Sequence, residues 1–153
     1  MNDVWRLPRV RWAHHPPEVK AAIRRAGFVP RIKQCFQNCQ RLVLFGDIEG
    51  ATYHEGVARS DSGSAVEHGW IVWRGRVVEL TNLDLEPIAG YEVPAAVLRA
   101  RLMERRAWGS VQPARLTDLL VAVHAGRAPE RVRQRLVDLL HLRLVDGGQA
   151  PAR

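Results

Sequence analysis

Apolar residues recur at helical spacing in two stretches near the start of the chain. The first stretch begins at Pro16-Pro17-Glu18 and ends at Gly27. The second begins near residues 32–34 and ends between Gly46 and Gly50. Proline near a helix start and glycine just after its end are typical helix boundaries. The pattern therefore predicts two amphipathic helices, with these residues on their apolar faces: Val19, Ala22, Ile23 and Ala26; Cys35, Cys39, Leu42 and Val43.

The middle of the chain changes to β-branched and alternating residues. Strands are predicted over residues 52–58, 66–73 and 76–81. A polar loop over residues 59–64 separates the first two strands. Arg74-Gly75 separates the last two by two residues, which is typical of a tight hairpin turn.

The rest of the chain reads as a loop followed by helices. Residues 82–94 contain Pro87, Gly90 and Pro94 and are predicted as a loop, and residues 95–107 as a helix. Two more amphipathic helices are predicted over residues 113–124 and 129–144. We expect an α+β fold: one domain over residues 1–110, starting with an extended arm (1–16), then a C-terminal helical extension (111–146) and a frayed tail (147–153).

Charge and composition limit the classes of function. The net charge of +7 invites a nucleic-acid interpretation, but Lys20 and Lys33 are the only lysines and the arginines are scattered, so this interpretation is not favoured. The apolar runs are too short for a bilayer and the N-terminus does not resemble a signal peptide, so we expect a cytoplasmic protein without membrane contact. Two cysteines four residues apart, with no second Cys/His pair at zinc spacing, predict neither a disulfide scaffold nor a metal site.

Cys35 is the first candidate for chemistry. It lies within about one turn of a predicted helix start, where unsatisfied N–H groups and the helix dipole favour a thiolate. Lys33 adds a nearby positive charge. Cys39 lies one turn deeper and is expected to be a small buried hydrophobe. Packing alone is the alternative for Cys35 as well.

His68 and Glu79 are the second candidate, because the predicted hairpin brings them together. If Arg74-Gly75 is the turn, Trp70 is opposite Glu79, and His68 shares a face with Trp70. Glu79 is then diagonal to His68, at about 7 to 8 Å between Cα atoms, within reach of both side chains. Glu67, Asn82 and Asp84 do not fit this geometry. A half-exposed histidine paired with a surface glutamate is the alternative.

Residues 30–94 resemble a group of small bacterial and phage proteins that is similar to the papain-like and transglutaminase-like superfamily. The resemblance rests on four ordered segments, namely Lys33–Asn38, Tyr53–Ala58, Glu67–Val72 with Gly75–Thr81, and Gly90–Pro94. It implies that Cys35 is the nucleophile, His68 the general base and then acid, and Glu79 the orienting carboxylate. The chain departs from the group in having Glu79 in place of the usual Asp and Leu80 in place of the usual Pro.

These observations predict an amide or peptide hydrolase, or an acyl transferase, that works through a thioester on Cys35 without metal or cofactor. Gln34 is a candidate oxyanion donor, and Tyr53 and Trp70 are candidate cleft residues, although helix-end solvation and strand packing explain them as well. One alternative is a nucleic-acid or protein-binding module that uses the two basic C-terminal helices, with Arg131, Arg133 and Arg135 along the second. Another is an inactive family member. The acyl substrate and the oligomeric state stay open.

Overall fold

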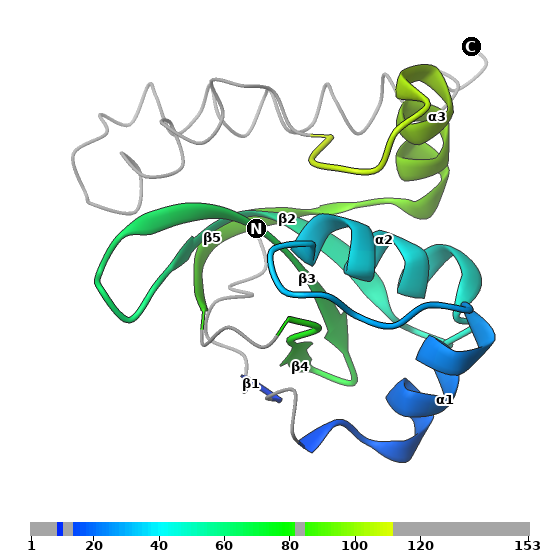
Figure 1. Cartoon of the computed structure of the whole chain (residues 1–153), viewed down its shortest axis with the longest axis horizontal. Coiled ribbons are helices and arrows are strands. Elements are labelled where there is room, and N and C mark those ends of the chain that lie inside the picture. Colours follow the sequence, from blue (N-terminus) through cyan, green and yellow to red (C-terminus); the bar gives the residue numbers. More distant parts are fainter. Residues whose placement is uncertain (1–8, 11–13, 82–84, 112–153) are drawn as a thin grey trace, which may run out of the picture.

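The computed structural model describes residues 9–10, 14–81 and 85–111 of the 153-residue chain. Within this part the fold is α+β, as the sequence predicts. A single sheet has the strand order β1-β4-β3-β2-β5 (Figure 1). The pairs β4–β3, β3–β2 and β2–β5 are antiparallel, whereas β1 pairs in parallel with β4. The strands are β1 (Arg9–Val10), β2 (Thr52–Arg59), β3 (Ala65–Trp73), β4 (Arg76–Val78) and β5 (Glu86–Val93).

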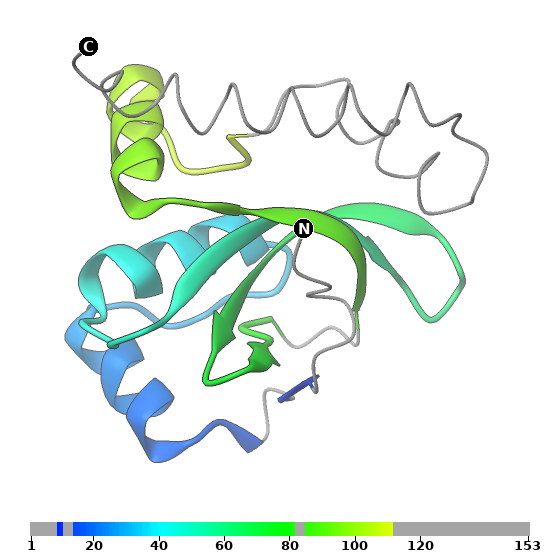
Figure 2. The ribbon, with the colours of Figure 1, turned by 180° about the vertical axis from the view of Figure 1, so that it is seen from behind.

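Three described helices pack together beside the sheet. They are α1 (Pro17–Arg25), α2 (Cys35–Phe45) and α3 (Ala95–Arg105). Helix α2 lies between the other two, and the view from behind shows the same arrangement (Figures 1 and 2). Both predicted N-terminal helices are confirmed, and α2 begins at Cys35 itself. No helix in the described part of the chain is long and apolar enough to cross a membrane.

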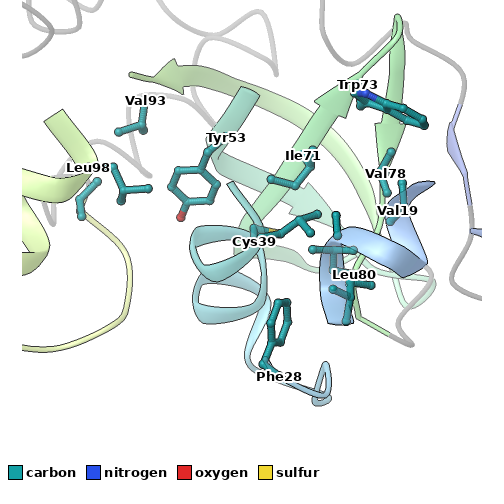
Figure 3. Packing of buried hydrophobic residues seen from close by; sticks show 14 of the residues in the cluster. Val19, Phe28, Cys39, Tyr53, Ile71, Trp73, Val78, Leu80, Val93 and Leu98 are labelled. Carbon is teal, nitrogen blue, oxygen red and sulfur yellow. The ribbon is translucent and has the colours of Figure 1, made fainter. Parts of the chain in front are cut away.

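The main core fills the space between these helices and one face of the sheet. Tyr53, Ile71 and Val78, from three different strands, belong to one buried cluster with Cys39 of α2 (Figure 3). Because side chains alternate along a strand, the neighbours of these residues lie on the other face. That second face carries His54, His68 and Trp70, and a smaller cluster of Trp70 with Val77 and Val72. Both faces of the central strands are buried.

The predicted hairpin has the predicted register. Trp73 is opposite Arg76, Val72 opposite Val77, and Ile71 opposite Val78. Arg74 and Gly75 both have positive φ, 48° and 68°. Two consecutive residues with positive φ are the requirement of a type I′ turn, whose twist matches that of the strands.

The prediction of a loop over residues 82–94 is wrong, because β5 pairs with β2 over most of this range. Proline and glycine argue against a strand in the interior of a sheet, and this is why Pro87 and Gly90 led to the prediction of a loop. Strand β5 lies at the sheet edge, where proline is tolerated, and its pairing with β2 has a register shift directly next to Pro87. Gly90 lies under the Trp70 ring, and a Cβ there would come within 2.4 Å of Trp70 Cη2. Strand β4 also ends at Val78, three residues before the predicted end.

Candidate functional site

His68 and Glu79 form a buried pair at the end of the hairpin. His68 Nε2 lies 2.7 Å from Glu79 Oε2, and the side chains are 0% and 9% exposed. A carboxylate only accepts hydrogen bonds, so His68 Nε2 carries the proton and Nδ1 is the nitrogen available as a base. The contact follows the alternation of side chains between the two faces of the hairpin, as the sequence predicts, although Glu79 lies one residue beyond β4.

The Glu79 carboxylate is held on its other oxygen by Thr81. Glu79 Oε1 accepts hydrogen bonds from the backbone N–H of Thr81 at 2.9 Å and from its hydroxyl at 2.7 Å. Each carboxylate oxygen therefore has a fixed donor, and the group cannot rotate without losing one of them. Such a carboxylate fixes the orientation of the partner imidazole and also places a negative charge beside it.

His15 fixes the backbone of the same glutamate. Its Nε2 lies 2.5 Å from the Glu79 carbonyl oxygen, so this nitrogen carries a proton and donates it. His15 is 5% exposed, and burial lowers its pKa. Glu79 lies outside the regular pairing of β3 with β4. The bond from His15 therefore supplies its carbonyl oxygen with a donor that strand pairing does not provide.

Cys35 is the third member of the cluster. It is buried at the first position of α2, where the dipole and unsatisfied N–H groups of the helix favour negative charge. Burial lowers the pKa of His68, but hydrogen bonding with Cys35 and Glu79 and the charges of both groups outweigh it and raise the pKa to about 9. The Cys35 thiol therefore lies within interaction range of the imidazole.

No hydrogen bond of regular geometry joins the Cys35 thiol to the His68 imidazole among the described residues. Nδ1 of His68 is buried and makes no hydrogen bond of regular geometry within the described residues. With Nε2 taken by Glu79, Nδ1 is the ring nitrogen left for Cys35. Catalytic hydrogen bonds are often long or poorly aligned before substrate binds and tighten afterwards. The cluster thus has the composition and order of a nucleophile, base and orienting acid.

The loop before Cys35 is clamped by Asn38. Its side-chain amide accepts from the Arg31 N–H at 3.3 Å and donates to the Arg31 carbonyl at 2.8 Å. Within this loop Lys33 has a φ of 63°, in the left-handed region that a lysine rarely adopts. Asn38 therefore fixes the backbone that leads into the candidate nucleophile.

Cys39 has the structural role that the sequence predicts. It is 0% exposed, and its thiol donates to the Gly69 carbonyl oxygen at 3.3 Å. Burial raises its pKa well above the usual range. Both cysteines are free. Among the described residues no group of His, Cys, Asp or Glu could hold a metal ion.

Trp70 packs beside His68, on the face of the sheet away from α2. The Trp70 ring stacks with His68 and with His54, at 6.1 Å between centroids in each case. Burial lowers the pKa of His54 to about 4, so this second histidine is neutral at pH 7. Trp70 is 0% exposed, so it supports the His68 ring from inside the protein and does not form an open wall of a cleft.

Tyr53 belongs to the core, which is the packing alternative that the sequence left open. Its hydroxyl donates to Glu55 at 2.6 Å and accepts from Gln40 at 3.1 Å. Glu55 and Gln40 in turn hold the segment after α3, through Ser110, the Val111 N–H and both backbone groups of Gly109. This network docks residues 109–111 onto the sheet and α2.

Gln34 precedes Cys35 directly, at the N-cap position of α2. It makes no capping hydrogen bond with its side chain, and its backbone carbonyl accepts from the Asn38 N–H at 2.8 Å. Its position beside the thiol is compatible with the predicted oxyanion role.

Residues that sequence reasoning missed hold this site in place. Thr81 was predicted only as the end of a strand, and His15 as part of an arm. An Asx or Ser/Thr residue two positions after a candidate carboxylate is a signal that could have identified Thr81. No local pattern indicates His15, because its contact with Glu79 spans 64 positions. The predicted pair of C-terminal helices lies outside the described residues.

Comparison with known proteins gives no further assignment. No family model, curated protein or solved structure matches this chain. The geometry of Cys35, His68 and Glu79 is therefore the basis on which a function can be argued.

Proposed function

We propose that the protein is a cysteine-dependent amide or peptide hydrolase, or an acyl transferase, of the papain-like or transglutaminase-like kind. The observation that carries the proposal is the position of His68, which is held by Glu79 on Nε2 and is close enough to Cys35 for the thiol to raise its pKa. Helix start, imidazole and carboxylate come from three separate segments, and they meet in a buried cluster. This is the general arrangement of an activated nucleophile whose base is oriented by a third group.

Activation begins with transfer of the Cys35 thiol proton to Nδ1 of His68. A histidine with a pKa of about 9 keeps this proton at neutral pH, and the resulting imidazolium stands between a thiolate and the Glu79 carboxylate. The thiolate then attacks the carbonyl carbon of an amide, forming a C–S bond and placing negative charge on the carbonyl oxygen. The N–H groups at the start of α2, with Gln34 beside them, are suited to receive that charge.

Collapse of this intermediate breaks the C–N bond, and the His68 imidazolium gives its proton to the leaving amine. A thioester then joins the acyl group to Cys35. Water or a second amine attacks this thioester while His68 takes the proton of the incoming group, and Cys35 leaves as the thiolate. The scheme consumes no oxidant or reductant. It suits the cytoplasm, where reducing conditions keep a cysteine as a free thiol.

Acyl transfer from an activated ester tests the proposal. We expect p-nitrophenyl acetate at pH 7 to acetylate Cys35, located by peptide mass spectrometry, and hydroxylamine to remove the acetyl group. The matched control Cys39→Ala should behave as wild type, because Cys39 is enclosed in the core. His68→Ala should slow the reaction by about 10²-fold or more. Absence of the acetyl group from Cys35, or an unchanged rate in His68→Ala, would favour a protein that keeps the fold and only binds.

A further inference from the structure

A second site lies at the opposite end of α2 from Cys35. A groove of about 630 Å³ opens between the last turn of α2, α3 and the segment that follows α3. Phe45 lies ten positions after Cys35 in this helix, which corresponds to a rise of about 15 Å. The side chains that line the groove are mainly apolar: Leu44, Phe45, Leu102, Met103, Ala107 and Trp108.

Large apolar side chains at this groove are exposed. Met103 is 78% exposed, Phe45 56% and Trp108 38%. Phe45 and Trp108 meet edge to face, with ring centroids 6.1 Å apart, so they form a shaped wall and not two isolated residues. Contiguous exposed apolar surface of this kind marks an interaction site. Methionine adapts its shape to a partner, and aromatic residues contribute strongly to binding.

Arginines surround this apolar surface. Arg99 and Arg106 line the groove, and the Arg41 guanidinium lies over the Trp108 ring at 5.8 Å. Within the part of the chain that the structure describes, none of the three has a carboxylate partner. Neighbouring Arg101 does have one, Glu104, at 3.1 Å. A positive rim without counter-charges selects an acidic partner.

Charge also argues against two other occupants. Residues 112–153 of the same chain contain seven arginines against four Asp and Glu residues, so this segment carries a net positive charge of the same sign as the rim. A second copy carries the same net charge of +7. A foreign acidic partner fits better than either of these.

We propose that this groove binds an acidic amphipathic helix of another protein. A helix with apolar side chains at positions i, i+3 or i+4, and i+7 fills a groove between two helices, and its acidic face then meets the arginines on the rim. The groove is concave, which suits a helix better than the surface of a bilayer. Binding here leaves Cys35 unobstructed, so this inference does not depend on the proposed chemistry.

The test uses a synthetic helix with leucines on one face and glutamates on the other, and a matched control with every glutamate replaced by lysine. We expect the acidic peptide to shift the NMR signals of the Trp108 indole N–H and the Met103 methyl group, and to bind at least about tenfold more tightly than the basic peptide. The double variant Arg99→Glu/Arg106→Glu, altered only at exposed side chains, should reverse this preference.

Three outcomes would overturn the inference. The peptides could bind equally well, neither could shift Trp108 and Met103, or the charge-reversed variant could still prefer the acidic peptide. Phosphatidylglycerol vesicles are used in a separate experiment to test whether the surface binds a membrane instead. Perturbation of the same two residues by vesicles but not by the acidic peptide would assign the surface to a membrane.

Discussion

His68 Nε2 lies 2.7 Å from Glu79 Oε2, although the regular pairing of the hairpin ends one residue before Glu79. The strand places the glutamate on the correct face, and other groups then hold it there. Thr81 binds its second oxygen, and His15 binds its backbone carbonyl. A glutamate held at its backbone carbonyl and at the second oxygen of its carboxylate can orient an imidazole without itself moving.

The charge of Glu79 helps to keep His68 protonated. In Glu79→Gln one amide oxygen replaces two acceptors, so His68 or Thr81 loses its partner, and the negative charge disappears. We expect the pKa of His68 to fall from about 9, as measured by NMR titration of its imidazole C–H signals. Glu67→Gln, at an exposed position of β3 next to His68, is the matched control and should leave this titration unchanged. An unchanged pKa in Glu79→Gln would contradict the role assigned to this carboxylate.

His15 and His14 provide a matched pair, because the first is buried against Glu79 and the second is exposed. His15→Ala leaves the Glu79 carbonyl without its donor, and we expect a loss of about 1 to 3 kcal/mol in the free energy of unfolding. The rate of Cys35 alkylation should fall as well, since Glu79 is less firmly held. His14→Ala should change neither quantity. Equal effects of the two variants in urea unfolding would contradict the prediction.

His54 should make the protein sensitive to mild acid. Its pKa is about 4 when folded and about 6.5 when unfolded, so between these pH values the unfolded chain binds a proton that the folded chain does not. The free energy of unfolding therefore falls as pH falls from 6.5 through 4, by an amount on the order of 3 kcal/mol from this residue. His54→Gln should be less stable at pH 7 but should lose less on acidification. Urea unfolding at pH 7, 5 and 4 measures the difference, with His14→Gln as the control.

Gly90 and Trp70 are coupled by direct contact. A Cβ at Gly90 would lie 2.4 Å from Trp70 Cη2 and 2.7 Å from the Glu55 carbonyl oxygen. We expect Gly90→Ala to destabilise the fold by about 1 to 3 kcal/mol. Trp70→Phe removes the outer ring and should partly rescue this substitution. A double-mutant cycle in urea gives the coupling energy, and simple additivity of the two substitutions would contradict the packing described here.

The sequence predicts the parts of this fold that local rules govern. Helix α2 follows from apolar spacing, and the hairpin register follows from Arg74-Gly75, because a two-residue turn leaves little freedom. Strand β5 was missed because Gly90 and Pro87 are loop-formers unless their partners are known. Gly90 is required by Trp70, and Pro87 is tolerated at a sheet edge. Both facts depend on tertiary contacts, which cannot be derived from the pattern of a single sequence.

The same division holds for the candidate site. The alternation of side chains along the two strands is sufficient to predict that His68 and Glu79 lie on the same face. The position of Cys35 at a helix start is the reason for preferring it to Cys39 as the candidate nucleophile. His15 could not be assigned in this way, since its partner is the backbone carbonyl of Glu79, 64 positions away. Tyr53 was a candidate for the cleft because an aromatic residue on a strand fits both a core and a cleft. Its hydroxyl bonds to Glu55 and Gln40 decide for the core.

The rate of Cys35 alkylation by iodoacetamide as a function of pH tests the central claim most directly. If His68 and Cys35 form a thiolate–imidazolium pair, alkylation stays fast at pH 6, well below the value of about 8.5 at which an ordinary thiol ionises. Cys39→Ala should give the same profile, and His68→Ala should lose the reactivity at pH 6 by at least about tenfold. A single titration near pH 8.5 that is unaffected by His68→Ala would contradict the account.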